Sequence, residues 1–405
     1  MPALNEVRLL TDSLRLDVQP ETLPARLAAQ PVTDWSALLT HADRHSLTPL
    51  LCATWQAAGV LAALPESVRA HLLRAHADNA RRNSFIRAEV LELHALWQSA
   101  QAHGLVLKGW PLVERLYADP AERVLYDHDW LMAPAEAEAA HRALLEAGFR
   151  PLPGKDAWVE KHLPPVWRND GYRWDGYLFD PLYPRPVEVH TDLWEAGWRG
   201  LAVRALPDPW ARAQTRIVAG QPMRVLGDED TLIHLALHFA GHLVEREARL
   251  NQLLDLARFL ARTELDWDLI VRLAAAANVG RFVYASLDLA RAIFAAPSPP
   301  AAAQAHLAAA TPAPFRAWLT EHGPADVLAN DYRRRGRGQD YRLTFLAARS
   351  WRERFGIVRF AALPPLGQLQ AKYRVRHRWQ AALLYPVHIA ERALAYSRAL
   401  TARRP

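Results

Sequence analysis

Apolar positions at helical spacing dominate the first hundred residues. Residues 35–46 and 66–82 have the composition of helices, the first capped by Asp34 or Ser36 and the second opened by Pro65. A third segment, before Gly104, carries apolar side chains at the three- and four-residue spacing of one helix face, namely Phe85, Ile86, Val90, Leu93, Leu96 and Trp97. The pattern predicts an N-terminal helical region over residues 1–103.

The pattern changes to short apolar runs after Gly104. Turn residues separate these runs, which are rich in β-branched and aromatic side chains, as strands are. The predicted strands are residues 105–109, 123–132, 172–180 and 186–194, and the predicted helices are residues 110–118 and 135–149. This alternation predicts an α/β domain over residues 104–205.

Helical periodicity returns in the second half of the chain. Apolar residues recur about every 3.6 positions up to about residue 295, which predicts a C-terminal helical domain over residues 206–300. A Pro- and Ala-rich composition predicts a linker over 301–330, and residues 331–405 are expected to form a basic helical tail. The expected fold is α+β and mostly helical, with a small strand-containing domain inserted between two helical regions.

The composition is that of a folded, soluble chain, with 51% apolar and 23% charged residues. No run reaches the roughly 18 to 20 uncharged apolar residues that span a bilayer, and the first residues lack the basic and apolar regions of a signal peptide. The single cysteine, Cys52, excludes an internal disulfide and a Cys-rich zinc site, and its apolar neighbours predict an inert, buried thiol. We therefore expect a cytoplasmic protein with no transmembrane segment.

The positive charge is concentrated in the predicted tail. Residues 331–405 hold 17 Lys and Arg against 4 Asp and Glu. Aromatic residues alternate with arginines at 372–379, a pattern that suits nucleic acid or anionic lipid headgroups, although a solvated charged face is the alternative. The tail is therefore a candidate polyanion contact, with a second cluster at Arg333, Arg334, Arg335 and Arg337.

Two aspartates alternate on the strand predicted over residues 123–132. Residues i and i+2 of a strand point to the same face, so Asp127 and Asp129 project together from an apolar segment. Two adjacent carboxylates repel each other, and a divalent cation between them removes that cost. Mg²⁺ or Mn²⁺ prefers such oxygen ligands and supports phosphoryl displacement. An exposed strand edge, or pairing with Arg123, is the alternative interpretation.

A second acidic strand follows some 60 residues later. Glu188 and His190 share one face of it, while Val187 and Val189 are expected to face the core. His190 can orient Glu188 or carry a proton, and a structural hydrogen bond is an equally good explanation.

Candidate phosphate contacts surround the acidic strands. Lys108 and Gly109 lie at the turn after the first strand, where backbone N–H groups, a helix N-terminus and a lysine suit phosphate. Arg123 can bind phosphate as well as pair with Asp127. Trp110 and Trp130 can stack on a base, but core packing is the better explanation for tryptophans in this tryptophan-rich chain.

Three histidines, His234, His238 and His242, have the i, i+4, i+8 spacing of one helix face. The glutamate of a zinc-binding HExxH motif is absent, so a structural role is favoured over a metal site. These histidines can also face a nucleotide pocket together with Arg249 and Asp255, or Asp255 can pair with an arginine of the helix bundle.

In its motifs and their order, the chain resembles the uncharacterised bacterial nucleotidyltransferase-like proteins of the polymerase-β superfamily. The matching segments, which lie between about residues 35 and 300, are LVLKG (105–109), RVLYDHDWLM (123–132), HRALLEAGF (141–149), VEVHTDLW (187–194) and LIHLALHFAGH with RLNQLLDLARFL (232–260). The resemblance implies a small mixed sheet with two acids on one strand and the third on its neighbour. It also implies metal-dependent attack of an acceptor on the α-phosphate of an NTP, with release of pyrophosphate.

By position, the resemblance implies that Asp127 and Asp129 bind the metal ions and the triphosphate, that Glu188 completes the metal site and helps to activate the acceptor, and that Gly109 lines the phosphate path. The chain departs from the superfamily at Lys108-Gly109-Trp110, where Gly-Ser or Gly-Gly is usual. This departure leaves two alternatives open: transfer of another phosphate-linked group, such as a sugar from a nucleotide sugar, and a non-catalytic module that binds nucleotide, nucleic acid or membrane. The acceptor, a small molecule, peptide or protein, is not identified by the sequence.

Overall fold

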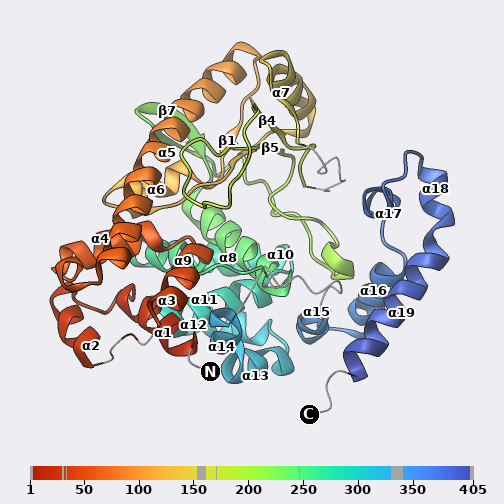
Figure 1. Cartoon of the computed structure of the whole chain (residues 1–405). Helices are drawn as coiled ribbons and strands as arrows, with labels where there is room; N and C mark the ends of the chain where they lie inside the picture. Colours follow the sequence, from red (N-terminus) through yellow and green to blue (C-terminus); the bar gives the residue numbers. More distant parts are fainter. Residues whose placement is uncertain are drawn as a thin grey trace.

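The computed structural model describes residues 3–29, 32, 34–152, 161–169, 171–245, 247–329 and 341–401. Helices make up most of this part of the chain. One mixed sheet lies above the helices of residues 228–328 in the view of Figure 1. The α+β, mostly helical fold expected from the sequence is therefore confirmed. Among the described residues, no helix is both long and apolar enough to cross a membrane.

The N-terminal region is helical, as predicted. Asp34 caps its third helix, because the Asp34 Oδ1 accepts a hydrogen bond from the N–H of Ala37 at 2.9 Å. Two separate helices were predicted between residues 66 and 104, and this prediction is wrong. The segment forms one long helix, because no glycine or proline interrupts it. The helices are α1 (Ala3–Ser13), α2 (Leu23–Ala29), α3 (Trp35–Arg44), α4 (Thr48–Ala57) and α5 (Glu66–Ser99), with short 3₁₀ turns η1 (Pro20–Thr22) and η2 (Leu61–Ala63).

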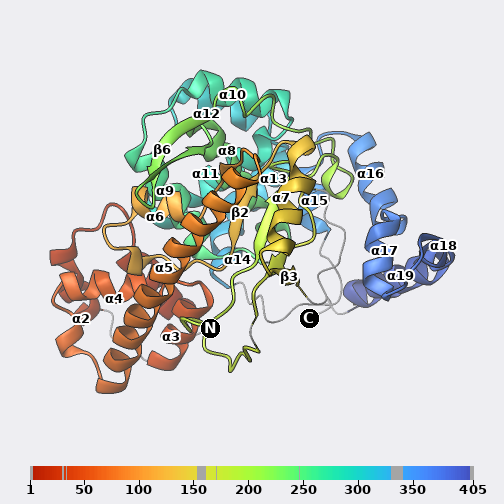
Figure 2. The ribbon, with the colours of Figure 1, turned by 90° about the horizontal axis from the view of Figure 1, so that it is seen from above.

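Seven strands of the described chain form one sheet in the order β3-β4-β5-β2-β1-β7-β6 (Figure 2). The two strands at its centre, β2 and β5, are parallel, whereas β1 is antiparallel to β2 and parallel to β7. The strands are β1 (Leu105–Val106), β2 (His128–Leu131), β3 (Arg150–Pro151), β4 (Val166–Trp167), β5 (Val187–His190), β6 (Gln214–Val218) and β7 (Gln221–Val225).

The sheet differs from the prediction in several places: β3 and β4 were not predicted, and β2 begins at His128 rather than at residue 123. The β6–β7 hairpin comes from beyond residue 205, and its two-residue turn at Ala219 and Gly220 has positive φ angles of 55° and 87°, which match the twist of paired strands. Residues 172–180, predicted as a strand, are irregular. There the Asp175 Oδ1 accepts a hydrogen bond from the N–H of Tyr177 at 2.8 Å, so turn chemistry outweighs the β propensity of the aromatic neighbours.

The prediction of a linker over residues 301–330 is wrong for the described residues, 301–329, because these are largely helical and packed. Alanine is the best helix former, and proline is tolerated in a first helical turn. Leu307, Phe315 and Trp318 are buried in the main hydrophobic core. The helices that follow the acidic strands, together with those between the strands, are α6 (Trp110–Leu116), α7 (Pro134–Glu146), α8 (Asp228–Glu245), α9 (Leu250–Arg262), α10 (Trp267–Ala276), α11 (Gly280–Phe294), α12 (Ala301–Ala309), α13 (Ala313–Glu321) and α14 (Gly323–Leu328).

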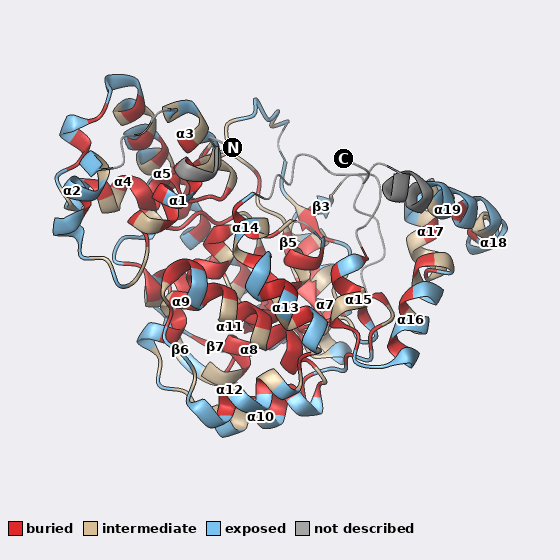
Figure 3. Ribbon diagram, turned by 90° about the horizontal axis from the view of Figure 1, so that it is seen from below, coloured by how far each residue is buried: buried red, intermediate tan, exposed pale blue. Residues whose placement is uncertain are grey.

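The C-terminal helices form an arm at one end of the molecule (Figure 3). Its first long helix is fixed to the body where Gly356 meets Gly200 of the 3₁₀ turn η4 (Trp198–Gly200): a Cβ on Gly356 would lie 2.3 Å from the Gly200 carbonyl oxygen. The buried Glu353 pairs with Arg281 at 2.8 Å. The arm consists of α15 (Arg342–Ala347), α16 (Trp351–Ala362), α17 (Leu366–Tyr373), α18 (Arg378–Leu383) and α19 (Tyr385–Thr401).

Candidate active site

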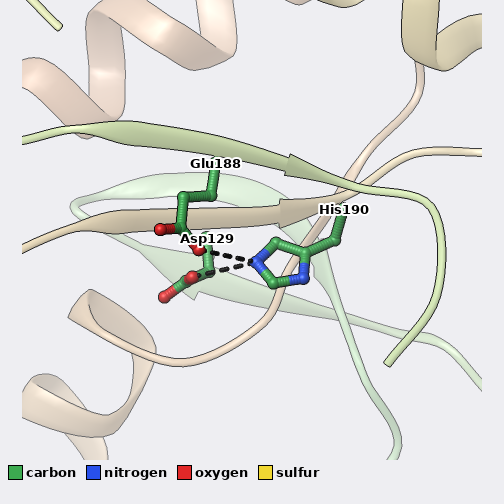
Figure 4. Close-up of side chains that lie close together, drawn as sticks. All are labelled: Asp129, Glu188 and His190. Atoms are coloured by element: carbon green, nitrogen blue, oxygen red, sulfur yellow. Dashed lines mark hydrogen bonds and ion pairs between the residues drawn. The ribbon is translucent and has the colours of Figure 1, made fainter. Parts of the chain in front are cut away.

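The pairing of β2 with β5 brings two of the predicted acids together. In this parallel pair Asp129 is directly opposite Glu188, and both side chains point to the same side of the sheet (Figure 4). Val187 and Val189 are 1% exposed and belong to the hydrophobic core, so the prediction that they face the core is confirmed. Asp127 lies one residue before β2 and is 35% exposed, whereas the Asp129 side chain is 2% exposed.

Lys108 forms ion pairs with both aspartates. Its Nζ lies 2.6 Å from Asp129 Oδ2 and 3.5 Å from Asp127 Oδ2. Burial opposes ionisation of Asp129, but Lys108 and His190 hold the pKa of this carboxyl well below its usual range. The pKa of Asp127 is raised, first by burial and then by the negative charge of Asp129. One lysine therefore does not neutralise the aspartate pair.

His190 contacts the other two acids. Its Nε2 lies 3.0 Å from Asp129 Oδ1 and 3.4 Å from Glu188 Oε2. Burial lowers the pKa of His190, but these two carboxylates reverse the effect and raise it. Burial likewise opposes ionisation of Glu188, and the His190 contact overcomes it, so the pKa of Glu188 falls to about 2. His162, which the sequence analysis missed, lies 3.7 Å from Glu188.

Possible cation ligands gather at two places in the described residues. Ligand atoms of Asp129, Glu188 and His190 lie within 4.8 Å of one another. The same holds for His242, Glu245 and Glu247. The second group includes an exposed glutamate, whereas the first is buried or half-buried and contains two of the three predicted acids.

Arg123 does not pair with Asp127, as one interpretation of the sequence held. Its Nε and Nη2 instead donate hydrogen bonds to Asp255 of α9 at 3.0 and 2.7 Å. The Tyr117 hydroxyl donates to the same carboxylate at 2.6 Å. Arg123 precedes β2 in the chain, and its long side chain reaches α9, so its ion pair links the segment before β2 to that helix.

Buried polar residues of α5 hold the segment that leads to Asp127. This segment follows the 3₁₀ turn η3 (Pro120–Glu122) and makes no strand pairs before β2, so its carbonyls need other donors. The Asn79 and Asn83 amides donate to the carbonyl of Arg123, at 3.2 and 2.8 Å. The Arg82 Nε donates to the carbonyl of Leu125 at 2.8 Å. These bonds fix the approach of the chain to the acidic site.

Gly109 and the two candidate tryptophans occupy different environments. Gly109 lines the same cleft as the acids and has a φ of 81°, a conformation that favours glycine. Trp110 and Trp130 are 4% and 2% exposed and belong to the core beneath the sheet. Core packing is therefore the correct interpretation of both.

The acids lie in a cleft of about 1140 Å³ that α8 and α9 also line. The row His234, His238 and His242 borders it, together with Arg249 and Asp255. Burial, followed by the charge of Lys108, lowers the pKa of His234 and His242 to about 3, so these imidazoles are neutral. Within the described chain, neither ring nitrogen of the buried His234 has a hydrogen-bond partner. A bound molecule therefore meets both charged and neutral polar groups in this cleft.

Comparison with known proteins adds a family to this geometry. A family model described as an uncharacterised nucleotidyltransferase matches residues 31–295, more than half of the chain and including every residue of the cleft described above. No curated protein and no solved structure matches the chain significantly.

Proposed function

The chain belongs to this family of uncharacterised nucleotidyltransferases, and from this premise we propose that it transfers a nucleotidyl group from an NTP to an acceptor, releasing pyrophosphate. The proposed catalytic and metal-binding residues are Asp127, Asp129 and Glu188, with Mg²⁺ or Mn²⁺ as the metal. The observation that carries the proposal is the parallel register of β2 and β5, which brings Asp129 beside Glu188 in a cleft of about 1140 Å³.

The chemistry of the site fits a hard divalent cation. The ligand atoms offered are mainly carboxylate oxygens, which Mg²⁺ prefers. Three carboxylates face Lys108 and His190, and the raised pKa of Asp127 reflects burial and repulsion from Asp129. A cation at this place relieves that repulsion.

Each residue then has a defined task. Asp127 and Asp129 would hold the cation. Glu188, whose pKa is lowered to about 2, would be the third carboxylate ligand. When bound, the cation supplies charge neutralisation and alignment of the triphosphate. His190 keeps two carboxylates in place through its contacts of 3.0 and 3.4 Å. Lys108, which forms ion pairs with Asp127 and Asp129, would contact phosphate oxygens.

The test is calorimetric titration of the purified protein with Mn²⁺, and with each NTP in the presence of Mg²⁺. Asp127→Asn is the variant of choice, because it removes a repelled carboxylate and should leave the melting temperature unchanged or raised. Mn²⁺ affinity should fall roughly 10-fold or more. Asp268→Asn, an exposed aspartate in the first turn of α10, is the control and should bind like the parent.

Pyrophosphate release with candidate acceptors then tests turnover. A protein that binds no NTP with Mg²⁺, and whose Mn²⁺ affinity does not respond to Asp127→Asn, would refute the proposal. Nucleotide binding without any turnover would favour the non-catalytic alternative.

A further inference from the structure

The arm of C-terminal helices exposes a row of large apolar side chains. Trp379 and Leu383 of α18 and Val387 of α19 are 63%, 70% and 47% exposed. A single residue, Leu384, joins the two helices and has nearly helical angles of −90° and −2°. The i, i+4, i+8 spacing therefore places the three side chains along one side of an almost continuous helix. Exposed apolar rows of this kind mark interaction surfaces.

Three exposed arginines directly precede this row. Arg374, Arg376 and Arg378 are all exposed, and none has an ion-pair partner among the described residues. The ring of His377 stacks against Trp379. Positive charge and apolar surface thus adjoin each other over residues 374–387. We call Arg374, Arg376, Arg378, Trp379, Leu383 and Val387 the arm face.

Helix α16 repeats the pattern independently. Trp351, Phe355 and Val358 follow one side of it at i, i+4, i+7 and are 72%, 63% and 53% exposed. Its opposite side carries the buried Glu353 and Ile357, which fix it to the body. Exposed arginines, Arg352, Arg354 and Arg359, accompany this row as well. The arm therefore carries exposed apolar rows on α16 and on α18–α19, and the opposite side of α16 packs against the body.

We propose that the arm face docks on an anionic lipid surface. Arginines complement the headgroup charge, and a tryptophan favours the boundary between headgroups and acyl chains, where leucine and valine side chains enter the apolar layer. A nucleic acid would engage the arginines and could stack on Trp379, but it would leave Leu383 and Val387 in water. An anionic lipid surface covers both kinds of side chain. This inference does not depend on the proposed catalytic function.

The first experiment is co-sedimentation of the full chain with vesicles of equal parts phosphatidylglycerol and phosphatidylcholine, and with phosphatidylcholine alone. The triple variant Arg374→Gln, Arg376→Gln, Arg378→Gln should weaken binding to the anionic vesicles on the order of 100-fold, since each basic residue near such a surface contributes about a factor of five. The control changes three exposed arginines elsewhere to glutamine, so that both variants have the same net charge: Arg26, Arg81 and Arg272.

The second experiment tests the apolar row. Leu383→Gln should weaken vesicle binding about 10-fold, because half or more of a leucine side chain no longer enters the bilayer. Leu182→Gln is the matched control: Leu182 is 65% exposed on the body, and its change should leave binding intact. Both leucines are exposed, so neither variant should alter the melting temperature.

Preference for anionic vesicles, with loss confined to the arm variants, supports the proposal. The proposal is wrong if anionic vesicles do not bind, or if the arm and control triples weaken binding equally. It is also wrong if the arm variants change only RNA or DNA affinity, or only self-association in sedimentation velocity, because those outcomes assign the face to a nucleic acid or to a second copy of the chain.

Discussion

Replacement of Arg123 by methionine tests whether the buried Arg123–Asp255 pair anchors the acidic segment. The two side chains are 9% and 3% exposed and share a two-pronged contact. Methionine keeps much of the volume but leaves the Asp255 carboxylate buried, with the Tyr117 hydroxyl as its remaining donor. Removing one partner of a buried pair costs about 3–5 kcal/mol. For a cooperative unit of 405 residues, this lowers the melting temperature by about 4–6 °C.

Differential scanning calorimetry measures the shift, and a double variant separates charge from packing. Arg123→Met with Asp255→Leu should recover all but about 1 kcal/mol, the part that belongs to the unpaired Tyr117 hydroxyl. Arg291→Met is the control, because Arg291 is 51% exposed in its pair with Asp288 and contributes less than about 1 kcal/mol. The reasoning fails if Arg123→Met lowers the melting temperature no more than the control, or if the double variant is less stable than the single one.

Three further predictions concern single residues. Burial opposes ionisation of Glu89, but His128 and Arg185 lower its pKa to about 2, below an ordinary 4.5. Glu89 therefore stabilises the fold above pH 4.5, and this contribution is lost as the pH falls toward 2; melting curves between pH 5 and 3 should fall more steeply for the parent than for Glu89→Gln. Gly109→Ala should cost about 1–3 kcal/mol in urea unfolding at a φ of 81°, and equal stability would show that the turn relaxes. Cys52, fully buried with its thiol pKa raised to about 11, should not react with a thiol reagent until the protein unfolds; fast labelling of the native chain would contradict its placement.

Local patterns predicted those parts of the site that depend on one strand at a time. The alternation of Glu188 with two valines identified the core face of β5 correctly, because side-chain direction in a strand is a local property. Asp127 lies one residue before β2, but it contacts the same lysine as Asp129. The family resemblance supplied the step that alternation cannot, namely that the two strands are neighbours. The match of the family model to residues 31–295 agrees with that resemblance.

Contacts between distant elements were beyond the sequence. The partner of Arg123 is 132 residues away on α9, and nothing in the spacing of either residue indicates it. His162 lies in a segment without periodicity, so no pattern pointed to its contact with Glu188. The Ala- and Pro-rich composition of residues 301–329 led to the wrong prediction of a linker, because alanine and proline suit packed short helices as well as linkers. The cluster Arg333 to Arg337 lies outside the described residues.

The parallel register of β2 and β5 makes the position of Asp129 relative to Glu188 independent of much of the chain between them. Parallel strands are joined by a crossover, and the crossover's length does not enter the pairing of Asp129 with Glu188. The loops of this crossover that lie outside β4 and the His162 contact can change in length without altering that pairing. The crossover also carries cleft residues such as His162 and Trp174, so side chains that line the cleft can change there while Asp129 and Glu188 keep their register.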